Sequence, residues 1–183
     1  MNWLHSILVL AVAFLAVFFE ASFGGFRHLL GAQIDFLPGL MVYTGLTTGW
    51  PAVILTAFCG GLWYDSFSLN PLGASVPSLL LIGMLAWRGR ELLENDRPGA
   101  QFFFGAVASA FQPLATLFVM LNIGAAPLLG WKSLWQWLVM ILGGGLFTPL
   151  CFILFRRIHR AFVYQPARQV AFRPDRQIKR GRS

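Results

Sequence analysis

The chain has 183 residues, of which 57% are hydrophobic and only 11% are charged, and its mean hydropathy is +0.66. A water-soluble domain of this composition would expose large apolar surfaces, so the composition excludes that class and predicts an integral membrane protein. No stretch alternates with the period of two that a membrane β-barrel requires, so the fold class is predicted to be all-α. The 14 Lys and Arg residues outnumber the 7 Asp and Glu residues, which gives a net charge of +7.

The first predicted span covers about Trp3 to Phe23, and Glu20 lies near its far end. Its apolar region is too long for a signal peptide and no basic residue precedes it, so we expect it to remain in the mature protein. A polar loop, residues 24–35, leads into a shorter second span from about Phe36 to Thr48. About 13 residues rise only about 20 Å, so this second span is expected to be tilted or partly re-entrant.

Four further apolar spans follow, separated by Gly, Pro, Asn or charged residues. They cover about residues 51–64, 72–87, 101–121 and 134–155. The sequence therefore predicts a compact bundle of about six transmembrane helices within residues 1–157. Residues 158–183 form a basic tail that is expected to be disordered until it binds a partner.

The distribution of Lys and Arg predicts the orientation of the bundle, because these residues concentrate in cytoplasmic loops. Nine of them follow Phe155, and the loop between the fourth and fifth spans adds Arg88, Arg90 and Arg97. With six spans, both groups lie on one side, so both termini are expected to be cytoplasmic. The residues then expected to gather near the outer surface are Glu20, Arg27, His28, Asp35 and Asp65.

Residues with metal-binding or nucleophilic side chains are few and scattered. Cys59 and Cys151 lie in apolar spans, where they act as small hydrophobic residues, and we expect no disulfide. His5, His28 and His159 fall at different ends of the chain and suggest no metal site. No nucleotide-binding, hydrolase or zinc-protease motif is present, so an enzyme is disfavoured and no cofactor is expected.

Asp65 has three interpretations. It could bind a substrate, pair with Arg27 across the outer face, or cap the turn Ser66 to Asn70 through its side-chain oxygens. The cap or the pair ranks above the ligand, because a carboxylate at a helix end reaches water and avoids most of the penalty of mid-membrane charge. Glu20 is read equally well as a carboxylate that snorkels to the interface or as a partner contact.

The basic residues after the last span predict contact with anionic lipid. Each cation near the cytoplasmic leaflet gains on the order of 1 kcal/mol, which explains the composition without a specific site. Nucleic acid is therefore not the expected partner. The candidate lipid contacts are Arg156, Arg157 and Arg160.

Two features of the first half of the chain carry a resemblance to a known family. The second span opens with Asp35-Phe36-Leu37-Pro38, and the third ends in a turn with the pattern Gly61-Leu62-x-x-Asp65-x-x-Ser68-x-x-Pro71-Leu72-Gly73. This chain thus resembles the rod shape-determining protein MreD family, over about Trp3 to Arg157. The residues singled out as a partner-binding or structural motif are Glu20, Asp35, Asp65, Ser68, Pro71 and Gly73.

The resemblance implies a non-catalytic subunit of the bacterial cell-elongation machinery, which builds peptidoglycan and sets rod shape. The implied partners are MreC, the actin-like MreB, the glycosyltransferase RodA and a class B penicillin-binding protein, and the implied location is the bacterial cytoplasmic membrane. The outer ends of the first four spans are expected to support a transmembrane or periplasmic segment of a partner.

The family is also similar in fold to the substrate-binding subunits of energy-coupling-factor transporters, which gives an alternative function. In that interpretation the chain captures a vitamin or a metal ion from outside. A vitamin binder should enclose a pocket with several converging polar groups. The outer loops of this chain offer only Arg27, His28, Gln33 and Asp65 for that purpose.

Overall fold

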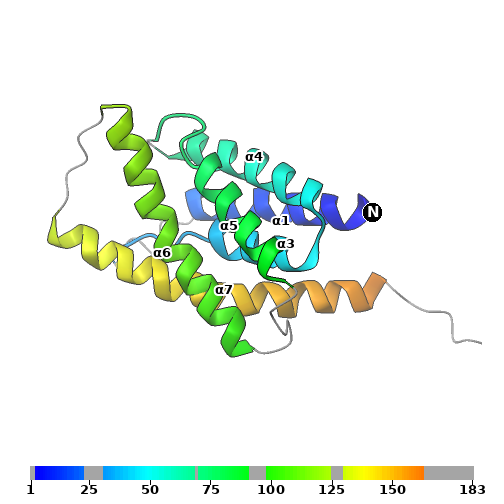
Figure 1. Cartoon of the computed structure of the whole chain (residues 1–183). Coiled ribbons are helices and arrows are strands. Elements are labelled where there is room, and N and C mark those ends of the chain that lie inside the picture. The colour runs from blue at the N-terminus through cyan, green and yellow to red at the C-terminus, as the bar shows by residue number, and fades with distance from the viewer. Residues whose placement is uncertain (1–2, 23–30, 69, 91–97, 125–129, 163–183) are drawn as a thin grey trace, which may run out of the picture.

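A computed structural model describes residues 3–22, 31–68, 70–90, 98–124 and 130–162 of the chain. These ranges contain six α-helices and no strand, which confirms the all-helical fold class (Figure 1). In chain order the helices are α1 (Trp3–Ser22), α3 (Leu37–Thr47), α4 (Trp50–Phe67), α5 (Val76–Gly89), α6 (Pro98–Asn122) and α7 (Trp131–Phe162).

Three helices are long and apolar enough to cross a membrane: α1, α6 and α7. The helices α3 and α5 have 11 and 14 residues, so they rise only about 16 and 21 Å against a hydrocarbon core of about 30 Å. The membrane character of the chain therefore rests on the three long helices. The count of six full spans remains a prediction.

Two helix ends differ from the sequence prediction by more than three residues. Helix α5, which corresponds to the fourth predicted span, begins at Val76 instead of near Leu72, because the residues before it form a turn. The last helix continues to Phe162 and includes Arg160, so the expectation that the chain is disordered from residue 158 is wrong for residues 158–162. Arg is a good helix former, and hydropathy marks the end of an apolar run, not the end of a helix. Residues 163–183 lie outside the described part.

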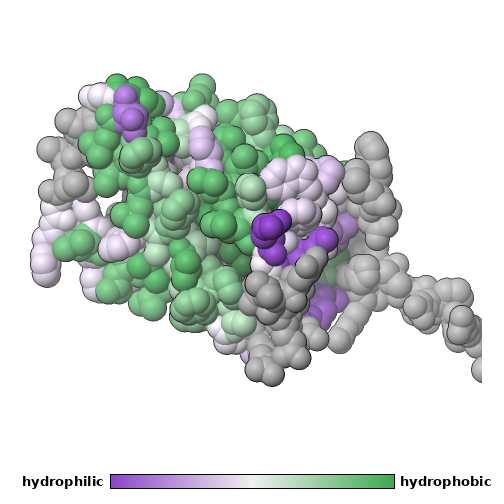
Figure 2. Space-filling view, in the orientation of Figure 1, coloured by the Kyte–Doolittle hydropathy of each residue, from purple (hydrophilic) through white to green (hydrophobic). Residues whose placement is uncertain are grey.

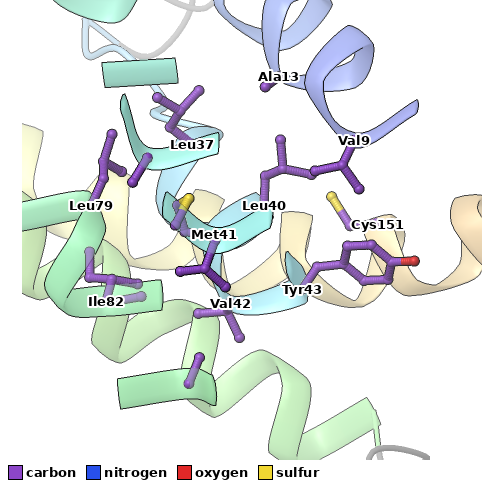
Figure 3. Close-up of a cluster of buried hydrophobic side chains, with 14 of the residues drawn as sticks. Val9, Ala13, Leu37, Leu40, Met41, Val42, Tyr43, Leu79, Ile82 and Cys151 are labelled. Atoms are coloured by element: carbon purple, nitrogen blue, oxygen red, sulfur yellow. The ribbon is translucent and has the colours of Figure 1, made fainter. Parts of the chain in front are cut away.

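Helix α3 forms the centre of the molecule. Every residue from Leu37 to Leu46 is buried, because α1, α4, α5, α6 and α7 all pack around this short helix. Figure 3 shows Val9 of α1 and Cys151 of α7 on one side of α3, and Leu79 and Ile82 of α5 on the other. A helix that is enclosed on all sides is expected to be apolar all round. The helix α3 is mostly apolar, and the hydroxyls of Thr44 and Thr47 donate to backbone carbonyls of the same helix.

Small residues let the helices approach closely. A Cβ atom on Gly45 of α3 would come within 2.6 Å of the Gly83 carbonyl oxygen on α5, so only glycine fits there. The most extensive helix contact joins α6 and α7, where Gly105 and Gly144 face Thr148 and Ser109. Such contacts are typical of helix interfaces in membranes, where packing replaces the hydrophobic effect as the source of association.

The surface has the polarity of a membrane protein. Figure 2 shows hydrophobic residues over the middle of the visible face and hydrophilic ones near its two ends. Large apolar side chains are exposed on the three long helices, including Leu15 at 60%, Phe118 at 68% and Leu146 at 61%. Contact of these side chains with lipid tails costs no free energy, whereas their contact with water would.

Candidate functional site

The candidate site lies where α4 ends and α7 begins, here called the outer end because the charge pattern predicts that it faces outside. Its main contact joins the end of α4 to the start of α5. The Asp65 carboxylate accepts a hydrogen bond of 2.6 Å from the Ser75 hydroxyl and one of 3.1 Å from the Ser75 amide. Both carboxylate oxygens of Asp65 are therefore engaged within the chain. We call this contact the Asp65–Ser75 clasp.

The residues between the two partners of the clasp form a compact turn. The Ala74 amide donates to the Pro71 carbonyl at 3.0 Å, and Gly73 between them has a φ of +88°. A turn with a positive φ at its third position favours glycine, because a side chain there is strained. At the other end, the Ser68 amide donates to the Tyr64 carbonyl at 3.0 Å and closes the last turn of α4.

Asp65 is only 2% exposed, so the expectation that this carboxylate reaches water at the helix end is wrong. Its side chain binds Ser75, the residue before α5, and not the Ser66 to Asn70 turn. The suggested partner Arg27 lies outside the described residues, and Ser75 already occupies both oxygens. The interpretation that the Asp65 side chain caps that turn is therefore wrong for the described residues, because both of its oxygens bind Ser75.

Asp35 plays the same role for the central helix. Its Oδ1 accepts a hydrogen bond of 2.9 Å from the Leu37 amide at the start of α3, and the side chain is 1% exposed. Its other oxygen, Oδ2, is buried and has no hydrogen-bond partner among the described residues. Burial raises the pKa of the Asp35 carboxyl to about 7, and the Leu37 hydrogen bond opposes part of that rise.

Glu20 belongs to a polar contact that holds the segment before α3 onto its neighbours. The Gln33 side-chain amide donates to Glu20 Oε1 at 2.8 Å. The Gln136 side chain on α7 binds the backbone of Gln33. Its oxygen accepts a hydrogen bond from the Gln33 backbone amide at 2.9 Å, and its NH₂ group donates to the Gln33 backbone carbonyl at 2.7 Å. Glu20 is thus hydrogen-bonded inside the bundle, and its Oε2 is buried without a described partner, which contradicts the snorkelling interpretation.

Of the residues predicted to gather, Glu20, Asp35 and Asp65 lie near one tyrosine, which the sequence analysis did not single out, and Arg27 and His28 lie outside the described residues. Tyr64 is close enough to Asp35, Glu20 and Asp65 for a charge on each to act on its hydroxyl group. Glu20 and Asp35 also act on each other. Among the described residues, no three His, Cys, Asp or Glu side chains are placed to hold a metal ion. The arrangement can lock helix ends together, and it offers no nucleophile with an adjacent base.

A cleft of about 220 Å³ opens beside Tyr64, between the ends of α4 and α6 and against α7. Ligand pockets usually have about 300–1,000 Å³, so the cleft is small for a vitamin. No charged residue lines it. Its lining consists of Tyr64, Asn70, Gln112, Pro113, Thr116, Leu117, Met120 and Met140.

At the opposite end of the bundle lie the candidate lipid contacts. Arg156 and Arg157 are exposed on α7, close to the end of its apolar stretch at Ile158. Arg160 lies on the same helix, but its side chain is outside the described part.

Sequence reasoning missed four residues of the site: Ser75, Tyr64, Gln112 and Gln136. The two glutamines carried a usable signal, because an uncharged polar side chain inside an apolar span needs a partner. Ser75 carried none, since its role depends on a turn that brings it back to Asp65.

Comparison with known proteins leaves the family open: no protein-family model, no curated protein and no solved structure matches this chain.

Proposed function

We propose that the chain is a non-catalytic membrane subunit of the bacterial cell-elongation machinery, as its resemblance to the MreD family implies. In this role it holds an MreC-like protein near RodA, a class B penicillin-binding protein and the MreB filament. The observation that carries the proposal is that both oxygens of Asp65 are hydrogen-bonded within the chain. The motif that carries the resemblance thus stiffens the bundle, which suits an organiser better than a ligand-binding subunit.

The energy-coupling-factor alternative predicts a pocket with converging polar groups at the outer end. The cleft there is small, about 220 Å³, and Asp65 does not line it. These two observations favour the organiser. The similarity in fold to such transporter subunits remains part of the proposal.

Anionic lipid is the partner proposed for the cytoplasmic end. Arg157 is exposed one residue before the end of the apolar stretch of α7, where the headgroups of a bilayer would begin. A cation at that depth pairs with lipid phosphates and fixes the height of the helix in the membrane.

The function is tested by depleting the protein in the bacterium that encodes it. Loss of rod shape, with less labelled peptidoglycan inserted along the side wall, is expected, and expression of the intact chain restores both. Normal shape together with reduced uptake of one vitamin would overturn the proposal in favour of the transporter subunit.

A further inference from the structure

Gln112 of α6 has a buried side chain whose hydrogen bonds are unmet. The residue is 2% exposed, and neither its Nε2 nor its Oε1 has a hydrogen-bond partner in the described part of the chain. The Thr116 hydroxyl donates to the Gln112 backbone carbonyl at 3.0 Å, so that bond does not involve the side chain. A buried amide without partners is costly, and each such group calls for an explanation.

The cleft beside Gln112 has the size and chemistry for one uncharged side chain. A water molecule takes about 30 Å³ of liquid, so 220 Å³ corresponds to about seven waters. That space is too small for a helix. Tyr64, Asn70 and Thr116 add hydroxyl and amide groups to the lining, which donate and accept hydrogen bonds without charge.

One edge of the cleft continues into an apolar stripe on the outer half of α6. Leu114, Phe118 and Leu121 are 49%, 68% and 56% exposed, and each follows the previous one by one helical turn. They neighbour the cleft-lining Pro113 and Leu117 in the sequence. A transmembrane helix packed along this stripe would pass over the cleft.

We propose that the cleft receives an Asn or Gln side chain from the transmembrane helix of a partner that lies along α6. The proposal rests on the proposed function in taking a membrane protein as the partner. A carboxamide both donates and accepts, so it complements the unmet amide of Gln112, which lines the cleft. A charged side chain would find no counter-ion in the lining, whereas polar side chains that bond across helices join membrane helices.

Photo-crosslinking in the native membranes tests this placement. The full chain carries p-benzoylphenylalanine in place of Phe118, beside the cleft. The matched control carries it in place of Phe103, which is on the same helix, 61% exposed and about 22 Å away along the axis. The Phe118 probe is expected to label one partner helix within a turn of an Asn or Gln, and the Phe103 probe is not. The substitution Gln112→Leu should reduce the labelling about tenfold, as the loss of one membrane hydrogen bond predicts.

Labelling of lipid alone, labelling of a helix that has no Asn or Gln at that depth, or no effect of Gln112→Leu would overturn the inference. Its failure is distinguishable from failure of the proposed function. If elongation proteins co-purify with the chain but the Phe118 probe does not label them, only the inference falls. If the probe labels an amide-bearing helix of an unrelated membrane protein, the inference stands and the proposed function falls.

Thermal unfolding of the purified chain tests the unmet amide without any partner. Gln112→Leu should raise the midpoint of unfolding, because it removes a buried polar group that has no partner. The matched variant Gln136→Leu should lower the midpoint, because Gln136 makes two hydrogen bonds to Gln33. A fall with Gln112→Leu as large as with Gln136→Leu would mean that the Gln112 amide is already paired, by water or by the chain, and would overturn the inference.

Discussion

The Asp65 carboxylate and the Ser75 hydroxyl meet at 2.6 Å across ten residues of sequence, and this contact ties the end of α4 to the start of α5. Both residues are buried, with exposures of 2% and 0%. Asp65, which the sequence left open as a ligand-binding residue, therefore holds two helices of the bundle together.

Asp65→Ala should destabilise the folded chain. It leaves the Ser75 amide and hydroxyl buried without an acceptor, which costs about 3 kcal/mol in the free energy of unfolding. Unfolding of the purified protein in detergent measures the loss. Ser66→Ala is the control, because Ser66 is the next residue of the helix and its exposed hydroxyl bonds only the Leu62 carbonyl. Unchanged stability of Asp65→Ala, combined with a lost partner, would instead make Asp65 a partner-binding residue.

Gly73→Ala should strain the turn that closes the clasp. The φ of +88° at Gly73 costs a residue with a side chain about 1–2 kcal/mol, although no atom lies within 4 Å of the new Cβ. Gly99→Ala is the matched control, since its Cβ also meets open space and its φ is not positive. Equal unfolding midpoints for the two variants would contradict a role for backbone conformation.

Gly105→Ala should push α6 and α7 apart. The added Cβ would overlap the Thr148 hydroxyl and come within 2.7 Å of the Gly144 carbonyl oxygen. Overpacking of this kind costs about 1–3 kcal/mol, and backbone atoms cannot move aside cheaply. The measurement is the yield and unfolding midpoint of detergent-extracted protein, with Gly130→Ala, which meets no atom within 4 Å, as the control. A normal midpoint for Gly105→Ala would show that the helices are less tightly packed than described.

Asp35 should make stability fall as pH rises. Its pKa in the folded chain is raised from 3.8 to about 7, so the folded state holds the proton more tightly than the unfolded state. The resulting stabilisation is fully present below about pH 3.8 and is lost as pH rises through 7, with a size of a few kcal/mol. Asp35→Asn should flatten this part of the pH profile of unfolding. An unchanged profile would show that folding does not raise the pKa of Asp35.

Arg157→Gln should weaken retention of anionic lipid near the C-terminal end of α7 by on the order of 1 kcal/mol. Native mass spectrometry of the purified protein counts the anionic lipids that remain bound. Lys132→Gln removes one exposed cation from the opposite end of the bundle and serves as the control. An equal loss of lipid with both variants would point to net charge instead of a local contact.

Much of the helical layout could be predicted from the sequence, because long apolar runs bounded by polar residues have few alternatives in a membrane. The predicted first and second spans end within one residue of α1 and α3. The end of α7 could not be placed, because hydropathy marks where lipid contact stops and Arg continues a helix as well as an apolar residue does.

The candidate site was predictable in part. The clustering of Glu20, Asp35 and Asp65 followed from the predicted topology, which placed one end of several spans together. The burial of these three side chains could not be predicted from the sequence, because it depends on hydrogen-bond partners that only the folded chain brings near them. Ser75 reaches Asp65 through the turn at Gly73, and Gln136 reaches Gln33 from 103 residues away.

Organising cell-wall proteins in the membrane is the role proposed for this chain. It is tested most directly by affinity purification of the tagged chain from its own membranes in mild detergent, with mass spectrometry of the proteins that come with it. If the chain has this role, an MreC-like protein is recovered together with cell-wall synthases. Recovery of two ATPases and a transmembrane coupling subunit would contradict it and establish a transporter subunit.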